Sequence, residues 1–329
     1  MPKPIATFAC TMKRTRTFAA FALCFLLTTT RVSANLNLPQ GSSAILEHIY
    51  SGRTDLAIPE SQAMQRELPA HPLGYLLEAE ARWWEIWCIA AEHKYGMTMP
   101  RHKDKQASDQ VFLELAAKAG ALAGASLAQH ETAEMHFYAG MAEAQSSRMY
   151  SLRGENRATA RAGVRGREHL LHALALDPSL SDADLGLGLY NYYVDTLSAL
   201  ARVLRFFMGI PGGSKEEGIR QLRQAMEHGQ LTPAEARFYL AINLHNYDQK
   251  YQDALELTTP LVEKYPDNAI FLLARGDLYA KLGRKELAMA DYRDAQGKPI
   301  ANRDCKRRIA ALAREAIQAL GTEELGSGH

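Results

Sequence analysis

The sequence has little of what membrane-spanning or strand-rich proteins contain. No stretch after residue 34 has 18 or more consecutive apolar residues, which excludes a membrane-spanning helix from that part of the chain. Alternation of apolar and polar residues with a period of two is scarce, which excludes a strand-rich fold. The sequence also lacks a readable Ser/His/Asp or Cys/His set, which is weak evidence against an enzyme because catalytic groups converge in space and not in sequence.

The N-terminal segment is typical of a secretory signal peptide. Three basic residues over 13–16 precede the apolar run Phe18–Leu27, and the small residues Ser33 and Ala34 follow. We expect cleavage between Ala34 and Asn35, which makes residues 1–34 a signal peptide and places the protein in the periplasm or envelope of a Gram-negative bacterium. A retained anchor is the alternative.

Loss of this segment changes the charge of the chain. Residues 1–34 hold five of the 38 Lys and Arg residues and none of the 37 Asp and Glu residues, so the remainder has a net charge of −4. That balance argues against a nucleic-acid partner. The apolar fraction of 47% is that of an ordinary globular protein with a large core.

Small and aromatic residues recur at fixed intervals near the C-terminus. Counting from Gly276, the intervals are 3, 7, 12, 19 and 23 residues to Tyr279, Gly283, Ala288, Ala295 and Pro299. Gly276 would let two helices cross closely, Gly283 would end the first helix, and Pro299 would stop the second. This pattern resembles the tetratricopeptide repeat, a helix–turn–helix unit of about 34 residues.

A second, internal similarity extends the repeat pattern. Residues 133–140 match residues 234–241 at an offset of 101, close to three repeat lengths. The small crossing residues then fall at Gly140, Gly188, Ala241 and Gly276. Two of their spacings exceed one repeat, so we expect lengthened helices or turns there.

The sequence is similar to exported bacterial tetratricopeptide repeat proteins. It is more distantly similar to the eukaryotic group that contains the fungal outer-mitochondrial-membrane protein of inclusion-body clearance. The resemblance implies an all-α solenoid, with degenerate helical repeats over 35–130, tetratricopeptide-like repeats over 131–300, and a capping helix and tail over 301–329. It implies no catalytic residues.

Segment 94–108 interrupts the helical pattern. It is polar and basic, and we interpret it as a loop.

An open array of repeats also bears on the two remaining cysteines. Cys88 and Cys305 could pair in an exported protein, but they are 217 residues apart, and each repeat of a solenoid touches mainly its neighbours. We therefore expect two separate thiols, unless the array closes on itself.

Three local patterns suggest metal or nucleotide binding, but each is better explained by an ordinary role of its residues in a helix or a loop. His130 and His136 are six residues apart, which places them on different helix faces. His169 and His172 follow Glu168 without a second copy of the motif that a di-iron bundle needs. The Gly-rich segment 209–214 lacks the Gly-Lys-Ser/Thr of a phosphate loop, and Ser214 there is a helix N-cap. We expect no metal and no cofactor.

These observations favour a non-catalytic scaffold that binds a protein or peptide in its concave face. Tyrosines suit such a groove because they carry an apolar ring and a polar tip. The candidate contacts are Tyr192, Tyr193, Phe238, His245 and Asp277. One alternative is a membrane-peripheral structural protein that uses the apolar helix predicted over 197–208. Another is a metal-dependent enzyme on a helical scaffold.

Overall fold

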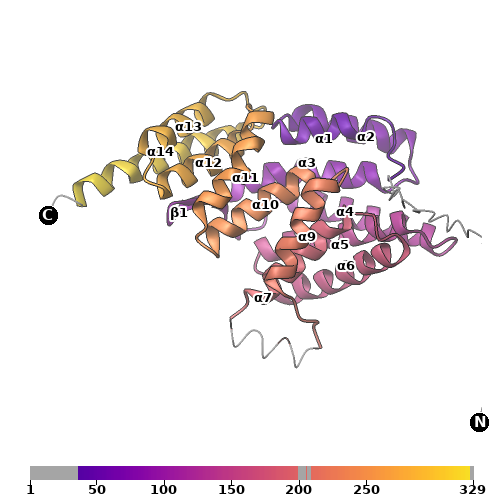
Figure 1. Cartoon of the computed structure of the whole chain (residues 1–329). Helices are drawn as coiled ribbons and strands as arrows, with labels where there is room; N and C mark the ends of the chain where they lie inside the picture. The colour runs from indigo at the N-terminus through magenta and orange to yellow at the C-terminus, as the bar shows by residue number, and fades with distance from the viewer. Residues whose placement is uncertain (1–35, 199–204, 206–208, 327–329) are drawn as a thin grey trace, which may run out of the picture. The chain divides into compact units, whose positions relative to one another are not determined.

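The fold is all-helical apart from one short hairpin (Figure 1). The computed structural model describes residues 36–198, 205 and 209–326, which belong to one compact unit. The first helices are α1 (Ser42–Tyr50), α2 (Thr54–Glu67), α3 (Leu73–Ala90), α4 (Ala107–Leu127), α5 (Ala133–Leu152), α6 (Asn156–Leu176) and α7 (Ala183–Asp195). The later ones are α9 (Lys215–His228), α10 (Pro233–Asn246), α11 (Tyr251–Lys264), α12 (Ala269–Lys281), α13 (Lys285–Gly297) and α14 (Arg303–Gly326).

Consecutive helices pack closely in pairs where the sequence places small residues. A Cβ atom at Gly276 of α12 would lie 2.5 Å from the Tyr292 ring of α13. One at Gly188 of α7 would lie 2.9 Å from the backbone oxygen of Gly218 in α9, and one at Gly140 of α5 would lie 2.6 Å from Leu170 of α6. A side chain at any of these glycines would require the neighbouring helix or its side chains to shift.

Other predicted repeat positions also have the expected environments. Ala241, Ala288 and Ala295 are buried, and Tyr279 packs partly buried against the core. Gly283 has a φ of 71° in the turn between α12 and α13, a left-handed conformation that favours glycine. These small residues therefore lie where neighbouring helices pack, and Gly283 lies in the turn between two of them.

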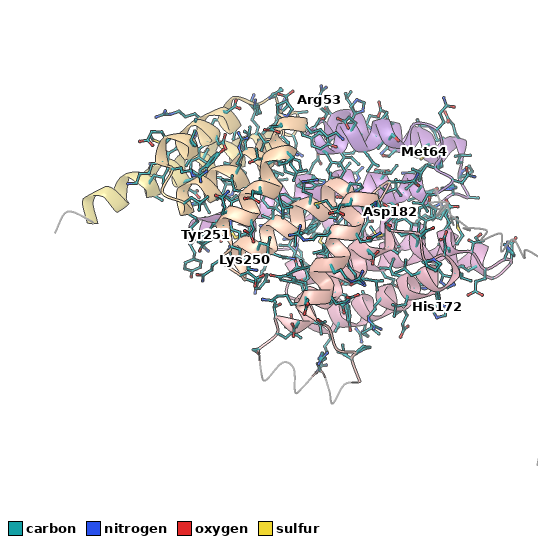
Figure 2. The ribbon with its side chains drawn as sticks, in the orientation of Figure 1. Arg53, Met64, His172, Asp182, Lys250 and Tyr251 are labelled. Carbon is teal, nitrogen blue, oxygen red and sulfur yellow. A yellow bond between two sulfur atoms is a disulfide. The ribbon has the colours of Figure 1, made fainter. Side chains whose placement is uncertain are left out.

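Polar side chains begin two of these helices. The Ser214 hydroxyl accepts a hydrogen bond from the Glu217 amide, which confirms Ser214 as the N-cap of α9. The buried carboxylate of Asp182 (Figure 2) accepts from the amides of Gln230, Leu231 and Thr232 just before α10. A carboxylate at this position satisfies amides that have no partner within the helix and interacts favourably with the helix dipole.

The segment predicted as a loop over 94–108 is a loop only in part. It contributes to an antiparallel hairpin of β1 (Ala91–Lys94) and β2 (Met97–Pro100). Tyr95 and Gly96 form its turn with φ values of 59° and 68°, the conformation that two-residue hairpin turns require. The hairpin depends on distant contacts, because the Thr98 amide donates to the Asp277 carboxylate of α12.

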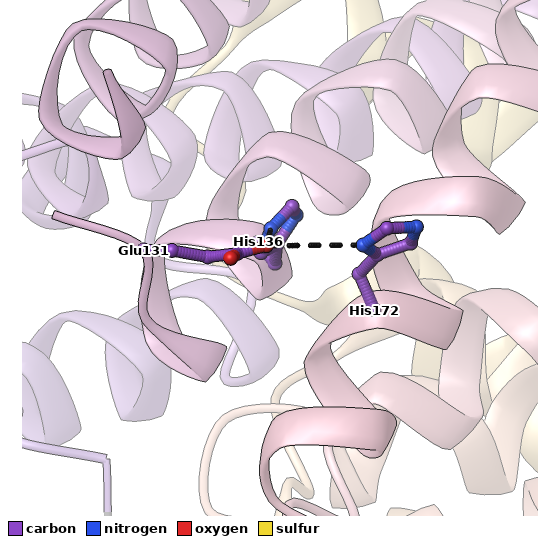
Figure 3. Close-up of side chains that lie close together, drawn as sticks. All are labelled: Glu131, His136 and His172. Atoms are coloured by element: carbon purple, nitrogen blue, oxygen red, sulfur yellow. Dashed lines mark hydrogen bonds and ion pairs between the residues drawn. The ribbon is translucent and has the colours of Figure 1, made fainter. Parts of the chain in front are cut away.

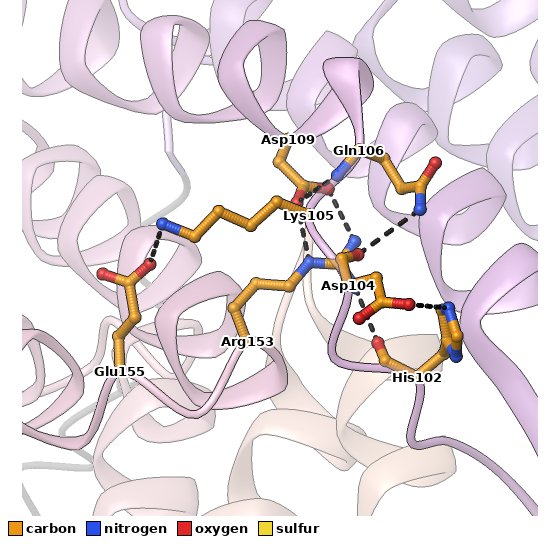
Figure 4. A network of polar contacts seen from close by, with 7 residues as sticks. All are labelled: His102, Asp104, Lys105, Gln106, Asp109, Arg153 and Glu155. Atoms are coloured by element: carbon orange, nitrogen blue, oxygen red, sulfur yellow. Dashed lines mark hydrogen bonds and ion pairs between the residues drawn. The ribbon is translucent and has the colours of Figure 1, made fainter.

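The rest of that segment is held by a buried ion pair (Figure 4). The Arg153 guanidinium, at the end of α5, donates to both carboxylate oxygens of Asp109 at 2.6 and 2.7 Å. It also donates to the backbone oxygen of His102, and the Gln106 amide donates to Asp109. One arginine therefore joins α4, α5 and the loop between the hairpin and α4.

A disulfide joins Cys88 of α3 to Cys305 of α14, with their Cα atoms 5.4 Å apart. The expectation of two separate thiols is wrong, because the last helix of the described chain, α14, packs against α3. Helix α14 also contacts β1, so the C-terminal helix lies against elements from the N-terminal third of the chain. The repeat spacing describes contacts between neighbouring helices and does not reveal this long-range closure.

The signal cleavage site, Ala34 and Asn35, lies outside the described residues, as does most of the predicted apolar helix over 197–208. Among the helices of the described chain, none combines the length and the apolar character that crossing a membrane requires.

Removal of the disulfide should destabilise the fold strongly. The bond closes a loop across a separation of 217 residues, and loss of a bond that closes a long loop costs about 2–5 kcal/mol. We expect the free energy of unfolding of Cys88→Ala/Cys305→Ala to fall by that amount in urea titrations. Non-reducing peptide mapping of the wild type should recover Cys88 linked to Cys305. A double variant as stable as the wild type would contradict this prediction.

Candidate functional site

The predicted ligand contacts are largely buried within the protein. Tyr192, Phe238, His245 and Asp277 are 0%, 1%, 5% and 1% exposed, and Tyr193 is partly buried. They therefore do not line an open groove. The prediction that they meet a ligand there requires correction, because the chain itself occupies the space in front of them.

Helix α3 covers one of these residues, Phe238, with its tryptophans. The Trp84 ring lies 5.1 Å from the Phe238 ring of α10 and 5.5 Å from the Phe271 ring of α12, measured between centroids. The Trp83 indole N–H donates to the Tyr239 hydroxyl at 3.0 Å. Aromatic contacts of this kind contribute about 0.5–1.5 kcal/mol each beyond their buried area. Helix α3 thus occupies the interior of the helix array (Figure 1).

A buried charge cluster lies beside these tryptophans. The Arg148 guanidinium of α5 donates to Glu80 of α3 and to Glu235 of α10, and it stacks over the Trp83 ring at 4.6 Å. Burial and the charge of Glu80 raise the pKa of Glu235. One cation therefore compensates two carboxyl groups and connects three helices in the interior.

Asp277 links α12 to the hairpin and to α13. Its carboxylate accepts from the Thr98 amide at 2.6 Å and from the Tyr292 hydroxyl at 2.9 Å, and its Oδ1 lies 3.4 Å from His93 Nδ1. Burial raises the pKa of Asp277 to about 7, against the opposing effect of these hydrogen bonds. Its role in this structure is to hold the hairpin on the helices.

One edge of the array keeps an aromatic surface in contact with solvent. The rings of Tyr192 and Tyr193 in α7 and Tyr247 after α10 lie 5.9 to 6.1 Å apart in all three pairs, and we call this group the tyrosine cluster. The Tyr192 hydroxyl donates to Asp248 at 2.9 Å, and this hydrogen bond fixes the buried ring of the cluster. Tyr247 is 47% exposed, so its ring is available on the surface.

The positive charge of an arginine, Arg101, acts on the exposed ring of the tyrosine cluster. Burial raises the pKa of Tyr247, whereas Asn246 and the positive charge of Arg101 lower it. Within the described part of the chain, the buried Nε of Arg101 has no hydrogen-bond partner. The edge therefore combines aromatic rings with a cation, a combination that the sequence did not indicate, since Arg101 belongs to the segment interpreted as a loop.

Three histidines and a glutamate gather where α5 begins and α6 ends, and Figure 3 shows two of the histidines with the glutamate. Glu131, His136 and His172 each offer a ligand atom, and these three atoms lie within 4.8 Å of one another. His169 contacts His136 from the other side. The sequence patterns around residues 130–136 and 168–172 pointed to no metal when taken separately, whereas the packing of α5 on α6 brings them together.

Comparisons with known proteins give no assignment. No family model matches the chain, and no curated protein matches it.

The environment of Asp277 predicts how stability depends on pH. Its pKa of about 7 in the fold exceeds the ordinary value of about 4, so the folded protein keeps a proton that the unfolded chain releases. Stability should therefore fall as the pH rises from about 4 to about 7, by up to about 1.4 kcal/mol per pH unit from this group. Urea titrations at several pH values should show a smaller slope for Asp277→Asn. An unchanged slope would contradict the assignment.

The cluster around Arg148 predicts a large difference between two arginine substitutions. Arg148→Met leaves two buried carboxyl groups without their cation and should lower the free energy of unfolding by about 3–5 kcal/mol. Arg165 also makes two hydrogen bonds to carboxylate oxygens, both of Glu143, but its side chain is 53% exposed. Arg165→Met should cost at most about 1 kcal/mol. If both substitutions lowered the free energy of unfolding equally in chemical denaturation, the prediction that the buried ion pairs of Arg148 matter more would be wrong.

Proposed function

We propose that the protein is a non-catalytic scaffold of the cell envelope, built from tetratricopeptide-like helix pairs, which binds a protein or peptide at its tyrosine cluster. The observation that carries this proposal is the half-exposed Tyr247 ring, which is held by Tyr192 and Tyr193 and on which the positive charge of Arg101 acts. The centre of the helix array is a poorer candidate, because α3 fills it.

The chemistry of this edge favours a particular kind of segment. A rigid tyrosine offers a large contact area with little loss of side-chain entropy, and binding surfaces are enriched in tyrosine and arginine for this reason. The Nε of Arg101 has no hydrogen-bond partner among the described residues, and a guanidinium in this state favours an acidic group on the ligand. The expected partner segment therefore carries an apolar or aromatic side chain next to a carboxylate.

The rigidity of the surroundings supports a binding role. Tyr192 is buried, and its hydroxyl lies 2.9 Å from Asp248 Oδ2 and 3.1 Å from the backbone oxygen of Asn243, two acceptors that share its one hydrogen. The ring next to Tyr247 is therefore fixed before a partner arrives. A surface that is already ordered loses little entropy on binding. The Cys88–Cys305 bond supports export, since disulfides persist in oxidising compartments.

Photo-crosslinking tests the proposal at single positions. A photoreactive phenylalanine analogue at position 247 should crosslink a defined protein in the native envelope. The same analogue at position 287 is the control, because Leu287 lies on α13 and is 48% exposed, nearly the same as Tyr247. Crosslinking that is equal at both positions, or absent at 247, would overturn the proposal.

Substitution then tests the energetics with the captured partner. Tyr247→Ala should weaken binding about ten-fold or more, as loss of an aromatic anchor does, and Arg101→Gln should weaken it further while reducing its dependence on salt. Leu287→Ala should leave the affinity unchanged. Binding measured by calorimetry, together with unchanged melting temperatures, distinguishes loss of a contact from loss of the fold.

A further inference from the structure

The histidine cluster lies at one end of the α5–α6 pair. Glu131 precedes α5 and His136 lies in its first turn, whereas His169 and His172 lie in the last two turns of α6. Because the two helices pack against each other, the beginning of one meets the end of the other. Figure 3 shows Glu131 and His172 approaching His136 from these two elements.

The ligand atoms are close to a coordinating arrangement. Glu131 Oε1 lies 3.0 Å from His136 Nε2 and 3.9 Å from His172 Nδ1. Ligand atoms of a tetrahedral zinc ion, with bonds of about 2.0–2.1 Å, are about 3.3 Å apart. The observed separations bracket that distance, so small side-chain rotations suffice to surround an ion.

The exposure of the three ligands makes such rotations possible. The side chains of Glu131 and His172 are 58% and 64% exposed, whereas that of His136 is 11% exposed. One ligand is therefore fixed in the fold, and the other two can adjust toward it from solvent. The exposed side also gives an ion a path of entry.

His169 provides the hydrogen bond that orients His136. The two Nδ1 atoms are 3.0 Å apart, a separation at which one nitrogen donates its hydrogen and the other accepts it. His136 Nε2 also lies 3.0 Å from Glu131 Oε1, where neutral His136 donates its Nε2 hydrogen to the carboxylate and accepts at Nδ1 from His169. Zinc binding at Nε2 requires that hydrogen to move to Nδ1, which then donates to His169. Ligating histidines commonly have such a partner on their second nitrogen, and the partner fixes the ring orientation.

We propose that Glu131, His136 and His172 bind one Zn²⁺ ion, with His169 as the positioning residue. Two neutral imidazoles and a carboxylate suit zinc, whereas Mg²⁺ and Ca²⁺ prefer oxygen ligands. Three protein ligands leave a fourth position for water. This site is independent of the function proposed for the tyrosine cluster and lies on different helices.

Zinc titration of the full chain, purified without a polyhistidine tag, tests the site directly. Calorimetry should show one Zn²⁺ bound per chain, and zinc should raise the melting temperature. Mg²⁺ should do neither. His172→Asn and Glu131→Gln should each weaken zinc binding at least ten-fold, and both substitutions leave the fold intact because the side chains are exposed.

His130→Asn is the matched control, because His130 is an exposed histidine next to Glu131 and lies outside the cluster. It should bind zinc as the wild type does. His169→Gln should weaken binding about ten- to a hundred-fold without changing the stoichiometry, as loss of an orienting partner does. The visible absorption of bound Co²⁺ should shift in this variant.

Two results would overturn the proposal. One is the absence of stoichiometric zinc binding by the wild type. The other is binding that His172→Asn and Glu131→Gln leave unchanged, which would place the zinc at other surface histidines.

Discussion

The structure depends on burial of α3 within the array formed by the other helices. Trp84 and Trp87 pack on Phe238 of α10, and Trp84 also packs on Phe271 of α12. Aromatic rings bury large apolar areas, and burial of apolar area is the dominant favourable contribution to folding. Without α3, the inward faces of α10 and α12 would expose phenylalanines to water.

The same arrangement explains why polar groups occur in the interior. Arg148 joins Glu80 of α3 to Glu235 of α10, and the Trp83 N–H joins α3 to Tyr239 of α10. Each contact has a direction, whereas apolar packing alone would tolerate a shift of α3 along its axis. Satisfied polar groups therefore specify the position of a helix that the aromatic rings stabilise.

The sequence indicated local features better than distant ones. Gly276, Gly283 and Ala288 were predictable because a close helix crossing and a tight turn each need a particular residue at a fixed interval. Burial of Phe238 was not, because the repeat pattern alone does not show that α3 fills the array. Burial of Tyr192 was not either, because it depends on contacts with Tyr247 and Asp248 that the repeat pattern does not contain. The hairpin was missed for the same reason, since its strands are held by Asp277, 179 residues away from Thr98.

The histidine cluster illustrates this limit and shows what could have overcome it. His136 lies at the beginning of one helix, and His169 and His172 lie near the end of the next. In an antiparallel helix pair those two positions share one end, so a search by paired helix ends would have found them. A search by spacing along one helix does not find such a site.

The disulfide also has a mechanical consequence. It converts the chain from Cys88 to Cys305 into a covalently closed segment that includes α4 to α13. A pulling force applied on either side of this segment passes through the sulfur–sulfur bond and not through the helices between the two cysteines. Under tension α1, α2 and the parts of α3 and α14 outside this segment would therefore extend, while the helices from α4 to α13, which carry the tyrosine and histidine clusters, would stay within the closed segment.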